Sequence, residues 1–560
     1  MRLGILEPKN HEDVPGTTRY FQNPEQQDAT GGGTARLKYD ASGKEPIILI
    51  PQPSDDPNDP LNWPLWKRDL ITFILCLAGI LATALGPILA ANTVTLSRLF
   101  ERNFTQVALL TGYFLLGAGA AAIFFVPSGR IWGKRHLFLI GICIIIASSA
   151  WAGSVGTDYR SFVGARVIQG VGAAPFESLL NAAVGDLYFV HQRGVRMAFT
   201  NLAVFGGAFF TPILVGKITH SLGWEWTFYF VAIFMAATLP VVFLFCPETA
   251  YRREPSLNTD IAAGEEKSEP AGPLLGREAG PAGQSGFVLF PRSSAAQRIG
   301  DANTPKKTFL ESLSLFDGRK TDDRYWVLLL RPFPLLLNPA FIWGCLIQGT
   351  MIGWTVFLGV LIAAVFIGPP YFWGEVKAGY TYAGPFVGAL AGFAVSGLLA
   401  DSSVRYLTKR NNGIYEPEFR IWLVLPMMII GGIGLYGFAL TAGGVISLEY
   451  TYHVPLVFFG FEVASMVIGA VASSLYIVEA YRDLTIEGLT LMIIFKNFFS
   501  FMLTFFAYDW LIHGGIERTM VTIASVQIGV CLLSIPMYVY GKRCRSYYHR
   551  HDLLAMTGLR

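Results

Sequence analysis

The sequence predicts an all-α membrane protein with twelve transmembrane helices in two bundles of six. Of its 560 residues, 52% are hydrophobic and only 15% are charged, whereas a soluble domain carries about 25% charged residues. Twelve apolar runs approach the length of about 20 residues that a helix needs to cross a bilayer. One long polar stretch separates the sixth run from the seventh. This composition argues against a soluble enzyme of several domains.

The apolar runs follow one another with short connections inside each half. They occupy residues 70–94, 106–127, 137–156, 161–185, 197–217, 226–246, 340–367, 380–400, 421–442, 454–477, 487–510 and 519–540. We therefore expect an N-terminal bundle over 67–246 and a C-terminal bundle over 339–541. Two six-span halves joined by a long loop are typical of secondary transporters.

Three polar segments flank or divide the bundles. Residues 1–66 are rich in Pro, Asp and Gly and show no charged start followed by a short apolar core, so we expect a disordered tail and no cleaved signal peptide. Residues 247–338 are rich in Glu, Gly, Pro, Ala and Ser, which predicts a mostly disordered linker. Residues 542–560 form a short basic tail.

Basic residues beside the spans predict the orientation, because Lys and Arg are enriched on the cytoplasmic side of a membrane. Most of them fall on the side that holds both termini and the linker, which we therefore expect to be cytoplasmic. Asn103 begins an Asn-Phe-Thr sequon in the loop between spans one and two, so it is a candidate glycosylation site on the opposite side. We expect a monomer in the plasma membrane.

Polar residues inside spans are costly and mark functional sites. Span four carries Arg166, Gln169 and Glu177. Eleven helical steps place Arg166 and Glu177 on one face, about 16 Å apart. Such a face suits proton-coupled or substrate-coupled transport. The alternative is a structural pair buried between helices, with Gly170 and Gly172 as a close-packing stripe.

The second half supplies its own intramembrane charges. Glu462 lies in span ten and Lys496 in span eleven, and we expect them to face each other across a cavity. Tyr113, Gln348 and Trp354 stand near mid-depth and are candidates for stacking on, or hydrogen bonding to, a flat or cationic substrate. Packing is the alternative role for each of these three.

Four motifs resemble those of fungal major facilitator superfamily transporters, over residues 55–545. Arg166 to Gly172 matches the span-four pattern RxxQGxG of the twelve-span drug:proton antiporter branch. DDPNDPLNW at 55–63 is similar to the cytoplasmic lead-in of many fungal members, and residues 413–420 and 246–249 resemble the loop before span nine and the exit from span six. The resemblance implies the major facilitator fold, a midplane cavity and alternating access by rocking. It also implies drugs, toxins or secondary metabolites as cargo.

The resemblance also implies gating residues. The loop between spans two and three resembles the family pattern GxLaDRxGRR but keeps only its end, and Arg130 stands where the family has aspartate. The second-half copy keeps the opposite end of the pattern, and span five keeps only part of the antiporter motif, with Thr211 before its proline. Asp186 with Arg193 and Arg196 is a second possible latch between the halves. The gating candidates are Gly129, Arg130, Gly133, Lys134, Arg135, Asp186, Arg193, Gly397, Asp401, Gly207 and Pro212.

We therefore expect a proton-coupled secondary transporter that exports small organic molecules. Arg166 and Gln169 would tune the proton site, and Glu177 or Glu462 would carry the proton or pair with a cationic group. The proton gradient serves as the driving force without a cofactor or metal, and the partners are the substrate, protons and lipid, with no nucleic acid. The alternatives are an uptake carrier for polyamines or other organic cations and, more remotely, a non-transporting nutrient receptor. An enzyme is not expected, because HExxH, GxSxG and phosphate-loop motifs are missing from the sequence.

Overall fold

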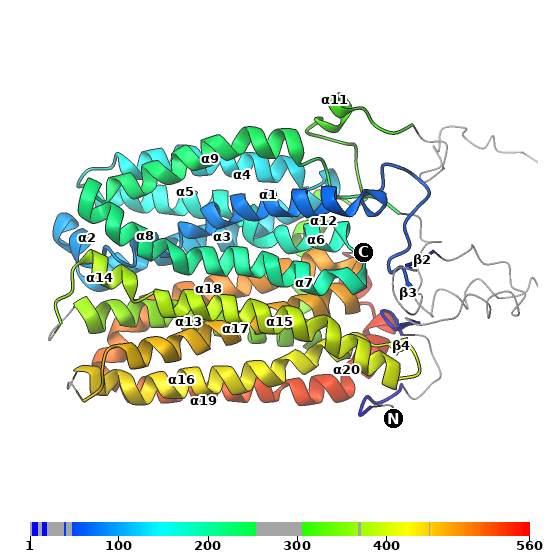
Figure 1. The fold of residues 1–560 in the computed structure, drawn as a ribbon. Helices are drawn as coiled ribbons and strands as arrows, with labels where there is room; N and C mark the ends of the chain where they lie inside the picture. Colours follow the sequence, from blue (N-terminus) through cyan, green and yellow to red (C-terminus); the bar gives the residue numbers. More distant parts are fainter. Residues whose placement is uncertain are drawn as a thin grey trace, which may run out of the picture.

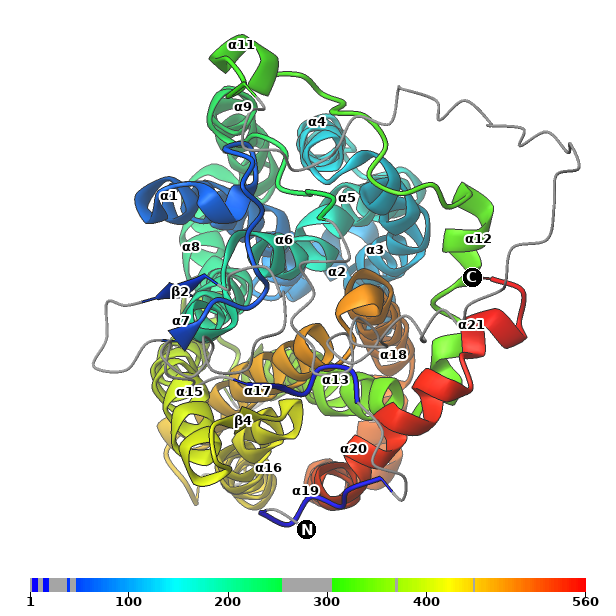
Figure 2. The ribbon, with the colours of Figure 1, turned by 90° about the vertical axis from the view of Figure 1, so that its right-hand side faces the viewer.

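The computed structural model describes residues 3–8, 14–19, 38–40, 47–253, 305–367, 371–446 and 449–559. In this part of the chain, long helices run roughly parallel and form two bundles, one from each half of the sequence (Figure 1). Seen along the helices, the N-terminal bundle lies above the C-terminal bundle, and α18 of the second bundle lies close to α3 of the first (Figure 2).

The N-terminal half contains six spans and several short connecting helices. Its fourth span is broken into α5 and α6, and its fifth is divided by a π-helical turn, η5. The elements are η3 (Pro60–Asn62), α1 (Leu65–Ala84), η4 (Pro87–Leu89), α2 (Thr93–Phe100), α3 (Phe104–Trp132), α4 (Arg135–Gly153), α5 (Tyr159–Ser178), α6 (Leu180–Leu187), α7 (Val190–Asn201), η5 (Leu202–Gly206), α8 (Gly207–Leu222) and α9 (Glu225–Phe245).

The C-terminal half repeats the six-span pattern. Its last span consists of two consecutive helices, α19 and α20. The elements are α11 (Phe309–Ser312), α12 (Tyr325–Leu330), η7 (Pro334–Leu337), α13 (Pro339–Ile367), α14 (Glu375–Tyr380), α15 (Ala383–Arg410), η8 (Pro417–Leu423), α16 (Val424–Ile446), α17 (His453–Ala480), η9 (Arg482–Leu484), α18 (Thr485–Gly514), α19 (Ile516–Leu532), α20 (Ser534–Arg550) and α21 (Leu553–Met556).

The predicted fold class is confirmed. Ten helical segments of the described chain are long and apolar enough to cross a membrane. The other two spans, α1 and α5, each have 20 residues. They are more polar, because α1 begins with Lys67, Arg68 and Asp69 and α5 contains Arg166 and Gln169. Each is still about 30 Å long, which is the thickness of the hydrocarbon core.

The expectation of a disordered N-terminal tail is wrong for the described residues. Strand β1 (Thr18–Arg19) pairs with β4 (Ile414–Tyr415), and β2 (Tyr39–Asp40) pairs with β3 (Ile47–Ile48). The Asp59 carboxylate organises residues 54–61 by accepting from the backbone N–H groups of Ser54 and Leu61 at 3.0 Å. Local side-chain acceptors thus replace the regular helix or sheet that the composition disfavours.

The linker and the C-terminal tail also contain order that composition did not indicate. Residues 305–338 form α11, α12 and η7, while residues 254–304 lie outside the described part of the chain. In α11, Thr308 and Glu311 form a reciprocal capping box. The tail at 542–560 continues helix α20 and then forms α21, so the last helix runs well past the predicted end of span twelve.

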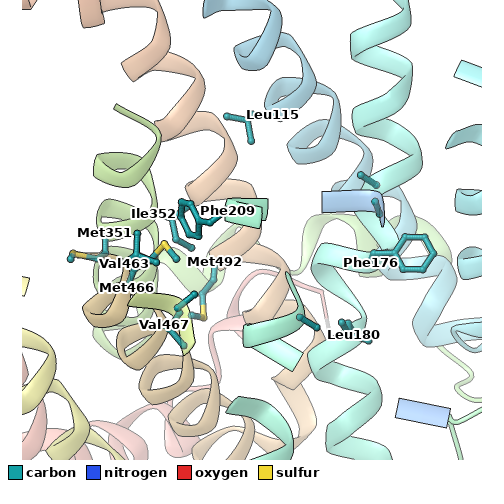
Figure 3. Packing of buried hydrophobic residues seen from close by; sticks show 14 of the residues in the cluster. Leu115, Phe176, Leu180, Phe209, Met351, Ile352, Val463, Met466, Val467 and Met492 are labelled. Atoms are coloured by element: carbon teal, nitrogen blue, oxygen red, sulfur yellow. The ribbon is translucent and has the colours of Figure 1, made fainter. Parts of the chain in front are cut away.

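The core lies between the helices of each bundle and continues across their interface. Phe209 of the N-terminal half lies beside Ile352 and Met466 of the C-terminal half (Figure 3). Met351, Val463 and Val467 pack behind them, away from the first bundle. Unbranched Met side chains adapt their shape easily, which suits an interface that must repack.

Candidate functional site

A cavity of about 170 Å³ lies between the two halves. Most of its wall is apolar, with hydroxyl groups and one pair of opposite charges among the lining residues. The N-terminal half contributes Thr83, Gly86, Pro87, Leu89, Ala90, Thr93, Val107, Ala108, Thr111, Phe114, Leu115, Glu177, Val204, Phe205, Ala208 and Phe209, and the C-terminal half contributes Ile352, Thr355, Val356, Gly359, Val360, Tyr382, Met466, Lys496 and Tyr508. Concave, mainly apolar sites with a few placed polar groups bind small organic molecules.

The pair of opposite charges joins the halves. Lys496 Nζ on α18 lies 2.6 Å from Glu177 Oε2 on α5, and both side chains are more than nine-tenths buried. Asn497 Nδ2 donates to the same oxygen at 3.1 Å. The sequence singled out both charges but expected Lys496 to face Glu462. The structure corrects this, because α18 packs against α3 and α5 and so presents Lys496 to the first half.

The Glu177–Lys496 pair also lies between two spaces. A second cavity of about 20 Å³, large enough for one water molecule, is lined by both members of the pair and by Asn181, Asn201 and Gln348. Asn181 is on α6 and Asn201 at the end of α7, so this second cavity lies on the side of the pair that faces the two termini. We call this the terminal side of the molecule. The pair therefore forms the floor of the larger cavity.

Glu462 on α17 lies directly behind the cavity wall. Its side chain is fully buried, and Oε1 accepts from Thr355 Oγ1 at 2.6 Å. Within the described residues, Oε2 has no hydrogen-bond partner and no cation lies within ion-pair distance. Thr355 itself lines the cavity. One hydroxyl group therefore connects this isolated carboxyl group to the substrate space.

Arg166 does not line the cavity, contrary to the expectation of a shared polar face with Glu177. Its guanidinium is fully buried and donates to Leu85 O at 2.8 Å, Gln169 Oε1 at 2.9 Å and Leu110 O at 3.2 Å. The ring of Phe114 lies 5.0 Å from the guanidinium carbon. Arg166 thus satisfies the Leu85 carbonyl group at the C-terminal end of α1, where a helix favours a cation, and also contacts the Leu110 carbonyl group of α3.

The rest of the span-four motif serves close packing. Gln169 completes the hydrogen bonds of Arg166 and reaches Ser148 O and Ser149 Oγ on α4, both at 3.5 Å. A side chain at Gly170 would collide with the Phe114 carbonyl, and one at Gly172 would press on Ile145. The packing alternative therefore describes these residues, whereas Glu177 three turns away belongs to the cavity.

All three predicted substrate contacts lie outside the lining of the larger cavity. Tyr113 packs against Phe501 at the α3–α18 contact, with ring centroids 6.1 Å apart. Trp354 is buried and donates through Nε1 to Gln527 Oε1 at 3.0 Å. Gln348 lines the second cavity, and its Oε1 has no partner in the described residues. Tyr113 and Trp354 therefore have packing roles.

On the terminal side, Arg130 forms a bridge between the halves. Its Nη1 lies 2.6 Å from Glu487 Oε2 in the first turn of α18 and 2.8 Å from Asp483 O. Arg331 Nη1 lies 4.0 Å from the same carboxylate. The residue that departs from the family pattern is thus the one that reaches the other half. Glu487 was not among the predicted sites, because the sequence alone does not show that it pairs with Arg130.

Lys134 and the backbone of this loop bind within the N-terminal half, whereas the Arg135 guanidinium also donates to Ser314 O at 2.9 Å, just after α11. Lys134 Nζ pairs with the Asp186 carboxylate of α6, and the backbone N–H groups of Lys134 and Arg135 donate to Glu248 at 2.9 and 3.0 Å. Gly133 has φ of +92°, and a side chain there would collide with Glu248. Gly129 packs against Leu137 and Leu179. These contacts fix the loop at the start of α4.

The expected pairing of Asp186 with Arg193 and Arg196 is wrong. Arg193 is buried and donates to Tyr188 O at 2.9 Å and Gly185 O at 2.6 Å, so it caps α6. Arg196 instead lies 3.4 Å from Asp69. Asp186 is paired with Lys134 instead.

The second-half motif lies at a contact between the bundles. Asp401 on α15 packs directly over Gly194 of α7, and its Oδ1 lies 3.6 Å from Arg420. Gly397 is one turn earlier on α15 and faces Ala198 across the same contact. A larger residue at Gly194 would push α15 away, so Asp401 and Gly397 lie where gating residues would be needed.

Span five bends around the cavity through η5, whose Val204 and Phe205 line it. Such π-helical turns often occur at functional sites. Gly207 follows the turn and lies against Ile80 of α1. Pro212 lies in α8 opposite Gly379 of α14, at a contact between the halves on the side away from the termini. The sequence indicated the glycine and proline here but not the π-helical turn.

Asn103 is exposed and caps α3, accepting from Gln106 N at 2.9 Å. Its glycosylation stays a prediction. The described residues contain no group of three or more His, Cys, Asp or Glu side chains placed to hold a metal ion.

Comparison with known proteins adds a family relationship. The family model described as Major Facilitator Superfamily matches residues 71–483. An uncharacterized MFS-type transporter of Schizosaccharomyces pombe is 26% identical, covering 97% of this chain and 94% of its own. Protein HOL1 of Saccharomyces cerevisiae is 24% identical, covering 98% of each chain. The structure of the human organic anion transporter MFSD10 aligns with a TM-score of 0.54 and 14% identity, covering 84% of this chain and 100% of that one.

Proposed function

The chain belongs to the major facilitator superfamily, and we propose that it is a proton-coupled secondary transporter that exports small organic molecules. Members of this family are membrane transporters and not enzymes. Alternating access moves the two halves so that a cavity between them opens to one side at a time. The proposal takes the terminal side as cytoplasmic, the plasma membrane as the location, a monomer as the working unit and the proton gradient as the energy source.

The Glu177–Lys496 ion pair is the observation that carries the proposal. It joins the halves at the floor of the larger cavity and separates that cavity from the terminal side. A substrate that leaves the cavity toward the terminal side, or enters from it, must pass this pair. Opening on that side therefore requires the pair to separate, and its charges then become available to cargo, water or protons.

Glu462 is the residue that we propose to carry the proton. An ionised carboxylate with a single hydroxyl donor and no cation is strongly disfavoured in a dry interior, so the sealed protein holds Glu462 protonated. Water that reaches Thr355 when the cavity opens accepts the proton. Glu177 is less suited to this role, because Lys496 and Asn497 already occupy its carboxylate group.

The wall of the cavity favours an amphipathic organic cargo. Apolar groups dominate the lining, while Thr and Tyr hydroxyls and the charge pair offer a few polar contacts. This supports the drug, toxin or secondary-metabolite class that the motif resemblance implies. The carboxyl groups of Glu177 and Glu462 favour a second candidate, the uptake of polyamines or other organic cations, in the same fold.

The test uses a pump-deficient fungal host that expresses the intact chain, the Glu177→Gln variant or the exposed-surface control Glu517→Gln. Tolerance and intracellular accumulation are recorded for a panel of toxic organic compounds and polyamines. Greater tolerance with lower accumulation, lost in Glu177→Gln and kept in the control, is the expected result. Greater sensitivity with higher accumulation would show that the protein takes its substrate up and does not export it. Undetectable flux of every compound would contradict transport and favour the receptor alternative.

A further inference from the structure

The N-terminal segment binds both halves on the terminal side. We use the name strap for its described residues 3–8, 14–19 and 47–63. The two ends of the strap bind different bundles, and Figure 2 shows its described parts lying over the ends of the helices.

The first part of the strap is held by the C-terminal half. Leu6 N donates to Val539 O at 3.0 Å, and Lys542 Nζ lies 2.7 Å from Glu7 Oε2. Thr17 Oγ1 donates to Glu416 Oε2 at 2.7 Å, and β1 pairs with β4. These contacts involve only residues of the second half, so they survive a movement of one half against the other.

The second part of the strap is held by the N-terminal half. Val190 N at the start of α7 donates to Ile50 O at 2.8 Å. Asp59 pairs with Arg253 at 2.8 Å just beyond span six. Burial alone would raise the pKa of Asp59, but hydrogen bonds and charge attraction from Arg253 and two backbone N–H groups hold it below its ordinary value. This anchor is therefore ionised at neutral pH.

A small hydrophobic cluster, which we call the seam cluster, joins both parts of the strap to both halves. Ile5 and Ile50 of the strap are 2% and 1% exposed. They pack with Val190 of the first half, and the second half completes the cluster with Val404, Leu407, Tyr415 and Phe419. This cluster draws apolar side chains from both bundles.

We propose that the strap is a releasable latch, and that the seam cluster must separate each time the terminal side opens. The inference rests on alternating access in the proposed function. The polar anchors at the two ends stay in place on their own halves, while Ile50 leaves Val404 and Leu407 and becomes exposed to water. Exposed apolar surface is unfavourable, so the seam cluster biases the protein toward the state closed on the terminal side.

A crosslinking experiment on the full chain tests the latch. Ile50→Cys with Val404→Cys places the link across the seam, and Ile50→Cys with Val190→Cys is the matched control within one half. Each pair is closed by oxidation or by a short bifunctional maleimide. We expect the Ile50–Val404 link to reduce transport at least tenfold and the control link to leave it within twofold. Undiminished transport with the seam link closed, or failure of that pair to link at all, would overturn the proposal.

A second measurement needs no transported substrate. Asn201→Cys reports opening of the terminal side, because Asn201 lines the second cavity. Ile50→Ala should raise the alkylation rate of this cysteine several-fold, whereas Leu61→Ala, which removes a strap side chain outside the seam cluster, should not. Equal rates in the two variants would contradict the latch even if transport is confirmed. If the two variants differ in the alkylation rate but no compound is transported, the latch is supported and the proposed function is contradicted.

Discussion

The Nζ atom of Lys496 lies 2.6 Å from Oε2 of Glu177, although 319 residues separate the two along the chain. One residue comes from each half, and less than a tenth of each side chain is exposed to solvent. A buried pair of this kind stabilises a conformation mainly because each charge would be costly without the other. The interface between the halves is therefore electrostatically specific at its centre.

Removing one member of this pair should destabilise the protein. Glu177→Gln or Lys496→Met leaves a buried charge without its partner, which costs about 3–5 kcal/mol. The double variant Glu177→Gln with Lys496→Met should recover most of that loss but stay inactive in transport. Thermal unfolding of the purified chain and a transport assay measure the two effects, with Glu517→Gln as the surface control. Single variants as stable as the parent chain would contradict a buried pair.

Replacing Glu462 should impair proton coupling without destabilising the folded protein. Glu462→Gln keeps the acceptor for Thr355 and the shape of the side chain, so we expect unchanged stability. Flux driven by a pH gradient should fall at least tenfold, because an amide cannot release a proton, while exchange of cargo without a gradient persists. Measurements in proteoliposomes with and without the gradient distinguish the two. A variant that keeps the parent's pH dependence would exclude Glu462 as the carrier.

Arg166 should prove sensitive even to a conservative change. Arg166→Ala leaves the carbonyls of Leu85 and Leu110 without their donor, and Arg166→Lys cannot reproduce the planar fork of donors. We expect both variants to reach the membrane yet lose transport, with Arg166→Ala less stable by about 1–3 kcal/mol for the unsatisfied groups. Normal transport by Arg166→Ala would show that the hydrogen bonds of Arg166 are not needed for transport.

The Arg130–Glu487 bridge should affect the balance between open and closed states. Arg130→Gln removes a contact between the halves on the terminal side, so alkylation of Asn201→Cys should accelerate. Exchanging the charges, with Arg130→Glu and Glu487→Arg together, should partly restore the parent rate. An identical rate in all three proteins would show that this bridge does not hold the terminal side closed.

The sequence was sufficient for the helices and for the rare charges inside them. Length and hydropathy identify spans, because the bilayer imposes one length on every segment that crosses it. The partners of these charges could not be predicted in the same way. Lys496 meets Glu177 and not Glu462 because α18 packs against the first half, and that choice depends on surfaces of several helices at once. Arg166 is on the same helix as Glu177, yet the carbonyl groups that it satisfies belong to the end of α1 and to α3, which the sequence does not show.

Composition was misleading for the N-terminal segment. Residues 50–63 lack apolar periodicity, so they were expected to be disordered, but Ile50 and Leu61 are buried against other parts of the chain and Asp59 supplies local acceptors. Order here depends on a docking surface made of both halves. A signal existed in the DDPNDPLNW stretch, whose aspartates, asparagines and prolines are typical of side-chain-capped turns.

The Glu177–Lys496 pair is electrically neutral as a unit, so the membrane potential exerts almost no net force on it. Moving one elementary charge through the potential is worth about 2.3 kcal/mol per 100 mV, and that energy can act only on the cargo and on the Glu462 proton. A cycle that exchanges one proton for one singly charged cation moves no net charge, so its driving force would not depend on the membrane potential. A neutral cargo would make the cycle electrogenic and its flux dependent on the membrane potential.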